Sequence, residues 1–253
     1  MKKAVFIILL FFITISNVFS QGVINSEKLL AHEVDKYYFI FSPSLDLQNG
    51  NSDVLEASLQ LSSLYKITKR HWVKGTGGLD IIQEDKEDIS NDKFCQLRHT
   101  YKLNEWSHTF SFFQLQNSYA LGVKKRQLLG TGVRVKLKKG AKLRFDIGVG
   151  IMNEKEEYNH DIPIANKYRA TSMIILQHSF DAVLLKNVTY YQPDISNVWD
   201  LRLLNEFDLT FVINDWLEYE LNYIVRYDNE PPSFLEKQLD QYITSGFNIK
   251  FNN

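Results

Sequence analysis

The sequence lacks most of the features that assign a chain to a common class of enzyme, nucleic-acid binder or helical membrane protein. Cys95 is the single cysteine among 253 residues, so no internal disulfide forms, and we interpret it as a small hydrophobic residue. The formal net charge of −1 argues against a nucleic-acid binder that relies on a basic surface. Beyond the first 20 residues, no apolar run approaches the roughly 18 residues of a spanning helix. A helical membrane protein is therefore excluded.

Signals of catalysis and cofactor binding are also few. No HExxH or paired-cysteine spacing indicates a metal site. The glycines of Gly75–Gly78 and Gly130–Gly132 fall inside predicted strands, where they mark bends or crowded positions rather than a phosphate-binding loop. His99, His108 and His178 are scattered and form no hydrolase motif. We predict no catalytic residues, no metal and no cofactor.

The N-terminus has the organisation of a secretion signal. Lys2 and Lys3 precede the apolar stretch Ala4–Ile15, and Val18 and Ser20 supply small residues before a cut ahead of residue 21. No cysteine stands at the cut, so a lipoprotein anchor is not expected. No Pro-, Gly- or Ser-rich linker divides the remainder. The predicted organisation is a signal peptide over 1–20, a periplasmic lead-in over 21–36 and one domain over 37–253.

Alternation of apolar and polar residues is the strongest pattern in the chain. In Ala141–Ile151 and in Leu217–Tyr227 the odd positions are aliphatic or aromatic except for Ala141, and most even positions are charged or small. Successive side chains of a strand point to opposite faces, so each segment has one apolar and one polar face. Many long segments of this kind in series favour a membrane barrel with apolar residues outside and charges inside.

The alternation predicts twelve strands, joined by five tight connections and six longer polar ones. The predicted strands are Tyr37–Leu47, Val54–Ile67, His71–Glu84, Asp92–Leu103, Trp106–Asn117, Arg126–Leu137, Ala141–Asn153, Lys167–Phe180, Leu184–Gln192, Trp199–Val212, Trp216–Asp228 and Lys237–Phe251. The longer connections include Asp85–Asn91 and Glu154–Asn166. Outer-membrane barrels have even strand numbers, short periplasmic turns and longer outer loops, so both termini are expected in the periplasm.

An all-β, antiparallel transmembrane β-barrel of about 12 strands is therefore the predicted fold. The barrel must close, because an open sheet edge in lipid leaves backbone groups unpaired at several kcal/mol each. Trp72, Trp106, Trp199 and Trp216 lie near strand starts, which predicts an interfacial belt. In the strand from Trp106, Phe110 and Phe112 share the parity of polar residues. Either a bulge shifts the phase or these rings point into the lumen.

Three segments carry a resemblance to a known family. They are Gly50–Asp53 after the first strand, Tyr227–Pro232 in the final hairpin and Phe247–Phe251 at the end of the last strand. Together they resemble domain of unknown function family 481, also described as salt-stress-induced outer-membrane proteins. The resemblance implies an outer-membrane β-barrel of unassigned activity and implies no catalytic residues. Asn252 and Asn253 follow the last aromatic, which departs from the usual terminal residue of such barrels.

Charged residues of both signs occupy the predicted lumen face. The candidate lumen-lining residues are Arg134, Arg144, Asp146, Arg202, Glu206, Asp208, Glu218, Glu220, Arg226 and Lys250. One interpretation is a water-filled path with charge selectivity. The other is a packed interior of ion pairs, since eight strands leave room for side chains only and sixteen leave a channel.

The leading functional hypothesis is a non-enzymatic protein of the cell outer membrane, with a narrow or gated pore for small solutes. An envelope-structural or partner-binding barrel acting through its outer loops is the alternative, and an outer-membrane hydrolase is a weaker one. The expected partners are outer-membrane lipid, the barrel-assembly machinery and small solutes, with no nucleic acid.

Overall fold

The computed structural model describes residues 25, 36–48, 54–85, 87–119, 121–140, 142–159, 162–233 and 237–252. The predicted signal peptide and the Gly50–Asp53 motif lie outside these residues, as does most of the predicted lead-in.

Twelve strands account for most of the described residues. They are β1 (Tyr37–Gln48), β2 (Val54–Lys66), β3 (His71–Glu84), β4 (Glu87–Lys102), β5 (Ser107–Ser118), β6 (Val123–Lys139), β7 (Leu143–Tyr158), β8 (Ala165–Phe180), β9 (Val183–Pro193), β10 (Leu201–Val212), β11 (Leu217–Asp228) and β12 (Leu239–Asn252). The predicted number and order of strands are confirmed.

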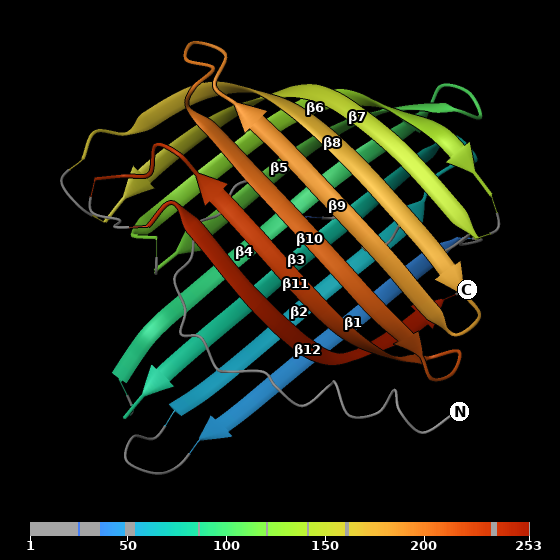
Figure 1. The fold of residues 1–253 in the computed structure, drawn as a ribbon, viewed down its shortest axis with the longest axis horizontal. Coiled ribbons are helices and arrows are strands. Elements are labelled where there is room, and N and C mark those ends of the chain that lie inside the picture. The colour runs from blue at the N-terminus through green and yellow to red at the C-terminus, as the bar shows by residue number, and fades with distance from the viewer. Residues whose placement is uncertain are drawn as a thin grey trace, which may run out of the picture.

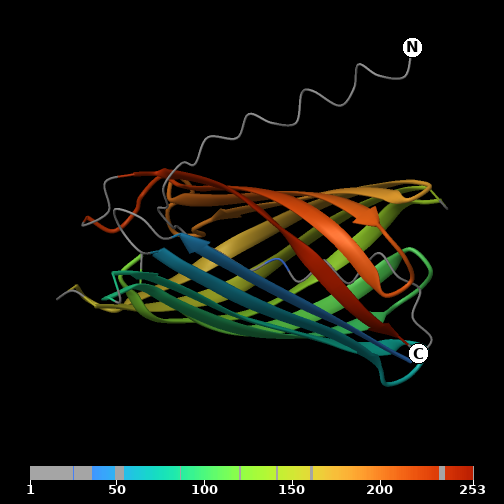
Figure 2. The same ribbon diagram turned by 90° about the horizontal axis from the view of Figure 1, so that it is seen from below.

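The strands form one closed antiparallel barrel in which each strand pairs with its neighbours in sequence. Closure is made by β1 and β12, whose register runs from Tyr38 opposite Asn252 to Phe41 opposite Ile249. The strands cross the barrel obliquely (Figure 1). Figure 2 shows two facing walls, with β9–β12 in one and β2–β5 in the other. Over the four residue pairs between β1 and β12, the first and last strands satisfy the backbone groups that lipid could not.

Alternation along each strand separates an apolar outer surface from a polar interior. On β7, Val149 and Ile151 are exposed whereas Asp146 is fully buried. On β12 the exposed side includes Phe247 and Phe251. Cys95 is also exposed, with Leu97 on the same face of β4. This inverted arrangement is that of a barrel whose outer surface meets lipid.

The predicted longer connections are partly wrong, because several strands extend farther than the apolar pattern. The residues 85–91 were expected to form a loop, but β4 begins at Glu87 and only residues 85–86 join it to β3. Asp85 has φ 50° in that turn. β7 likewise continues to Tyr158. Strand ends above the membrane face water on their outer side, so they need no apolar residues there and sequence alternation fades before the pairing ends.

Three of the four tryptophans are exposed, as the predicted interfacial belt requires. Trp106, Trp199 and Trp216 are exposed on the barrel. Trp72 instead packs inside, against the small cluster of Tyr38, Ile40 and Leu64. It shares the inward parity of buried Lys74 and Thr76, so the prediction that it belongs to an interfacial belt is wrong.

Candidate functional site: a divided lumen

The ten residues predicted to line the lumen lie on β6, β7, β10, β11 and β12. Arg134, Asp146, Arg202, Glu206, Asp208, Glu218, Arg226 and Lys250 are buried, and Arg144 and Glu220 are half-buried. They do not form one site. Arg202 belongs to a network of ion pairs at the end of the barrel that carries the longer connections. Glu206, Glu220 and Arg226 border a cavity. The others form ion pairs nearer the end that carries the tight turns.

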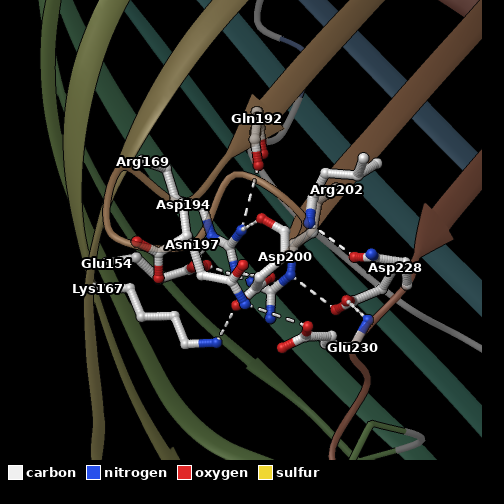
Figure 3. Close-up of polar contacts among 12 residues, drawn as sticks. Glu154, Lys167, Arg169, Gln192, Asp194, Asn197, Asp200, Arg202, Asp228 and Glu230 are labelled. Carbon is white, nitrogen blue, oxygen red and sulfur yellow. Dashed lines mark hydrogen bonds and ion pairs between the residues drawn. The ribbon is translucent and has the colours of Figure 1, made fainter.

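The network at the end of the longer connections is built around two buried arginines (Figure 3). Arg169 Nε lies 2.6 Å from Glu154 Oε2, and its Nη2 lies 3.0 Å from Asp200 Oδ1. Arg169 Nη1 also donates to the backbone oxygens of Gln192 and Asp200. Arg202 Nε lies 2.8 Å from Asp228 Oδ2. Charge-assisted bonds of this kind hold five strands and one connection together.

Other ion pairs belong to the same network. Arg202 Nη1 lies 2.5 Å from Glu154 Oε1 and 3.1 Å from Glu156 Oε1. Arg126 pairs with Glu156, and Lys167 pairs with Asp200. The basic members are Arg126, Lys167, Arg169 and Arg202, and the acidic members are Glu154, Glu156, Asp200 and Asp228. Charges of the two signs balance, so the network leaves no charge for a ligand to neutralise.

Asp194 lies at the same end of the barrel, in the connection between β9 and β10. Its backbone forms an isolated antiparallel β-bridge with Arg169. Its Oδ1 accepts hydrogen bonds from the backbone nitrogen and the hydroxyl of Ser196, both at 2.7 Å. Desolvation alone would raise the pKa of Asp194. The Ser196 hydrogen bonds and the charges of Arg169 and Lys167 outweigh it and lower the pKa below its usual value.

An apolar core fills the lumen beneath that network. Its buried members come from β5–β10: Phe110, Phe112, Leu128, Met152, Met173, Ile175, Val188, Tyr190 and Leu204. Phe110 and Phe112 therefore point into the lumen, which decides between the two alternatives left by the sequence. The Arg98 guanidinium carbon lies 4.8 Å and 5.5 Å from the centres of these two rings. We call this region, with the network above it, the packed half.

Glycines on the neighbouring strand make room for the two rings. A Cβ on Gly130 would lie 2.4 Å from Phe112, and a Cβ on Gly132 would lie 2.6 Å from Phe110 and 2.4 Å from the backbone oxygen of Val149. The sequence prediction that Gly130 and Gly132 mark crowded lumen positions is confirmed. Glycine is needed here for close approach rather than for an unusual backbone angle.

The other side of the lumen holds a cavity of about 590 Å³. It lies between β1–β5 on one side and β10–β12 on the other, and we call it the open half. Its polar lining consists of hydroxyls, amides and charged groups: Asn25, Ser42, Ser44, Glu56, Ser58, Gln60, Asp80, Asp92, Lys93, Asn117, Glu206, Glu220, Asn222, Arg226, Tyr242, Thr244, Ser245 and Asn248. Asn25 is buried here and donates to Glu206 Oε2 at 2.8 Å, so a residue of the predicted lead-in lies inside the barrel.

Ion pairs nearer the tight turns involve the remaining predicted residues. Lys250 Nζ lies 2.7 Å from Glu218 Oε1, and Lys186 Nζ lies 3.0 Å from Asp208 Oδ2. Asp146 receives Arg144 at 2.6 Å and has Arg134 at 3.7 Å. Of the four carboxylates on β10 and β11, Asp208 and Glu218 are thus each held by a lysine, whereas Glu206 and Glu220 accept hydrogen bonds from Asn25 and Asn248.

No group of histidine, cysteine and carboxylate side chains in the described part of the chain has the arrangement of a metal site.

None of the described residues belongs to a helix long and apolar enough to cross a bilayer.

A closed antiparallel barrel with an apolar exterior and a charged interior defines the class of transmembrane β-barrels. Within that class the chain belongs to the family described as "Protein of unknown function, DUF481", which it matches over residues 43–251. The resemblance inferred from the sequence is confirmed.

Comparison with solved structures finds other barrels at low identity. The KdgM porin is 10% identical, covering 85% of this chain and 99% of that one, with a TM-score of 0.48. The NanC porin is 10% identical, covering 84% and 97%, with a TM-score of 0.49. The translocator domain of autotransporter NalP from Neisseria meningitidis is 10% identical, covering 88% and 91%, with a TM-score of 0.49. No curated protein matches the chain.

Proposed function

We propose that this protein is a non-enzymatic barrel of the outer membrane that passes small solutes through a narrow path in its open half. The observation that carries the proposal is the polar cavity of about 590 Å³ beside a packed half. A twelve-stranded barrel lies between the sizes that are filled by side chains and those that hold a channel. Filling only one side of the lumen leaves a path narrower than that of a large porin.

Charge on the cavity wall sets the selectivity that we expect. The carboxylates at its lining are Glu56, Asp80, Asp92, Glu206 and Glu220, and the cations are Lys93 and Arg226. Rings or clusters of carboxylates favour cations in a water-filled path. Beyond Glu220 along β11 and Asn248 along β12 lies the Glu218–Lys250 pair, which borders the path toward the tight turns.

Conductance of the purified, folded protein in planar bilayers tests the proposal, with heat-denatured protein as the control. We expect small discrete current steps and a reversal potential that favours cations in a salt gradient. Glu220→Gln should reduce the preference for cations, because it removes a carboxylate from the cavity wall. Glu157→Gln, which removes an exposed carboxylate outside the lumen, should leave it unchanged. Folded protein that never conducts would overturn the proposal.

A further inference from the structure

Four charged side chains at the lining of the open half have no hydrogen bond or ion pair among the described residues; Lys93 has the outward parity of Cys95 and Leu97 on β4, and the other three have the inward parity of their strands. These three are Arg226 on β11 and Asp80 and Glu56 on β3 and β2, and all three line the cavity. This contrasts with the network at the mouth of the packed half, where each charge has a partner of opposite sign. Charged groups left without partners beside a cavity indicate a surface built to receive a charged ligand.

Arg226 is held in place without being neutralised. Its side chain is only 8% exposed, and its Nε has no hydrogen-bond partner. The guanidinium carbon lies 4.6 Å from the centre of the Tyr242 ring, a cation–π contact that fixes its plane. Glu206, Asp240 and Asp80 act on it electrostatically but do not form an ion pair with it. A planar guanidinium fixed in this way offers paired donors that match a carboxylate.

Asp80 and Glu56 lie on the wall that faces Arg226. β2 and β3 belong to one wall of the barrel and β11 to the other (Figure 2). The register places Asp80 opposite Ser58 and Glu56 opposite Ile82, on adjacent strands. Both carboxylates are exposed to the cavity. Two unpaired carboxylates on one wall thus face an unpaired guanidinium on the other, where Glu206 and Glu220 also line the cavity.

We propose that the open half binds a zwitterionic solute of the amino acid or short peptide class, an inference that rests on the proposed function for its access route. The ligand carboxylate pairs with Arg226, its ammonium group lies toward Asp80 and Glu56, and the amides and hydroxyls of the wall receive its peptide groups. The cavity volume falls within the roughly 300–1,000 Å³ typical of small-ligand sites. A neutral polyhydroxylated solute would displace water from three full charges without compensating any of them.

Calorimetric titration of the detergent-purified full chain tests this, with L-alanyl-L-alanine as the probe. Arg226→Gln and Asp80→Asn should each weaken binding about tenfold or more, the loss of one charge-assisted contact. Arg70→Gln and Asp215→Asn make the same changes at exposed turn positions outside the cavity and should leave binding unchanged. Heat-modifiable gel migration shows whether each variant retains the folded barrel.

Blocked and neutral probes separate the alternatives. N-acetyl-alanyl-alanine amide, which lacks both charges, should bind at least tenfold more weakly than the zwitterion. Equal binding of the blocked peptide, binding of maltose but not of the dipeptide, or no binding at all would overturn the proposal. Because binding is measured without current, a barrel that conducts but does not bind loses only this inference. A barrel that binds but does not conduct loses only the pore.

Discussion

Arg169 in the packed half and Arg226 in the open half are both buried inward-facing arginines, yet their surroundings differ. Arg169 is fully buried and contacts Glu154, Asp200 and two backbone oxygens. Arg226 stacks on Tyr242 with no ion pair. The difference lies in what the neighbouring strands bring within reach. In the packed half the facing positions carry carboxylates at contact distance, whereas Asp240, opposite Arg226 in the register of β11 and β12, acts on it electrostatically without forming an ion pair. One half of the lumen therefore contributes rigidity and the other keeps charge available.

The largest expected effect is a difference in the stability lost when each of the two arginines is replaced. Arg169→Gln should destabilise the barrel by about 3–5 kcal/mol, because the buried carboxylates of Glu154 and Asp200 would each lose the ion pair with Arg169. The same change at Arg226 should cost less, about 1–3 kcal/mol, since it removes a cation–π contact and the electrostatic attraction of Glu206, Asp240 and Asp80 rather than ion pairs in contact. Urea unfolding followed by tryptophan fluorescence measures both. Equal losses at the two sites would contradict the division of the lumen.

A smaller effect is expected from the same glycine substitution in each half. Gly132→Ala should cost about 1–3 kcal/mol through overpacking, because its Cβ would lie 2.4 Å from a backbone oxygen that cannot move aside. Gly246→Ala should leave stability unchanged or raise it by up to about 1 kcal/mol, since the nearest atom to its Cβ is 4.0 Å away. Unfolding midpoints of the two variants give the comparison. A costly Gly246→Ala would show that the cavity side is also tightly packed.

The smallest expected effect is the pH dependence of the stability that Asp194 contributes. Its pKa is lowered in the folded protein, so its contribution to stability is present above the pKa of the unfolded chain, about 3.9, and is lost as pH falls through the folded value. The difference in unfolding free energy between the wild type and Asp194→Asn should therefore be full near pH 6 and should shrink as pH is lowered below about 4. A difference that does not change with pH would show that the hydrogen bonds of Ser196 do not depend on the charge of Asp194.

Individual residues show how far the sequence could predict the site. Asp146 and Glu218 sit in clean alternation, so their inward direction could be predicted from parity alone. Glu154, Glu156 and Asp200 were missed, because Glu154 and Glu156 lie where the alternation ends and were assigned to a loop, and Asp200, at the start of the predicted strand Trp199–Val212, was not counted among the lumen residues. A signal was present: Glu154 and Glu156 continue the parity of Asp146 along β7. Trp72 was misplaced because closeness to a strand start was weighed above parity with Lys74.

The sequence by itself determined the strand number, their order and which face of each strand is polar. Those properties are local, since alternation with a period of two residues and the spacing of connections are written along the chain. The tertiary structure alone decided which inward charges meet. The contact between Arg202 and Glu154, and the placement of Arg226 and Asp80 at one cavity, depend on the register and curvature of strands far apart in sequence. Closure of the barrel sets these, and it fills one half of the lumen while leaving the other open.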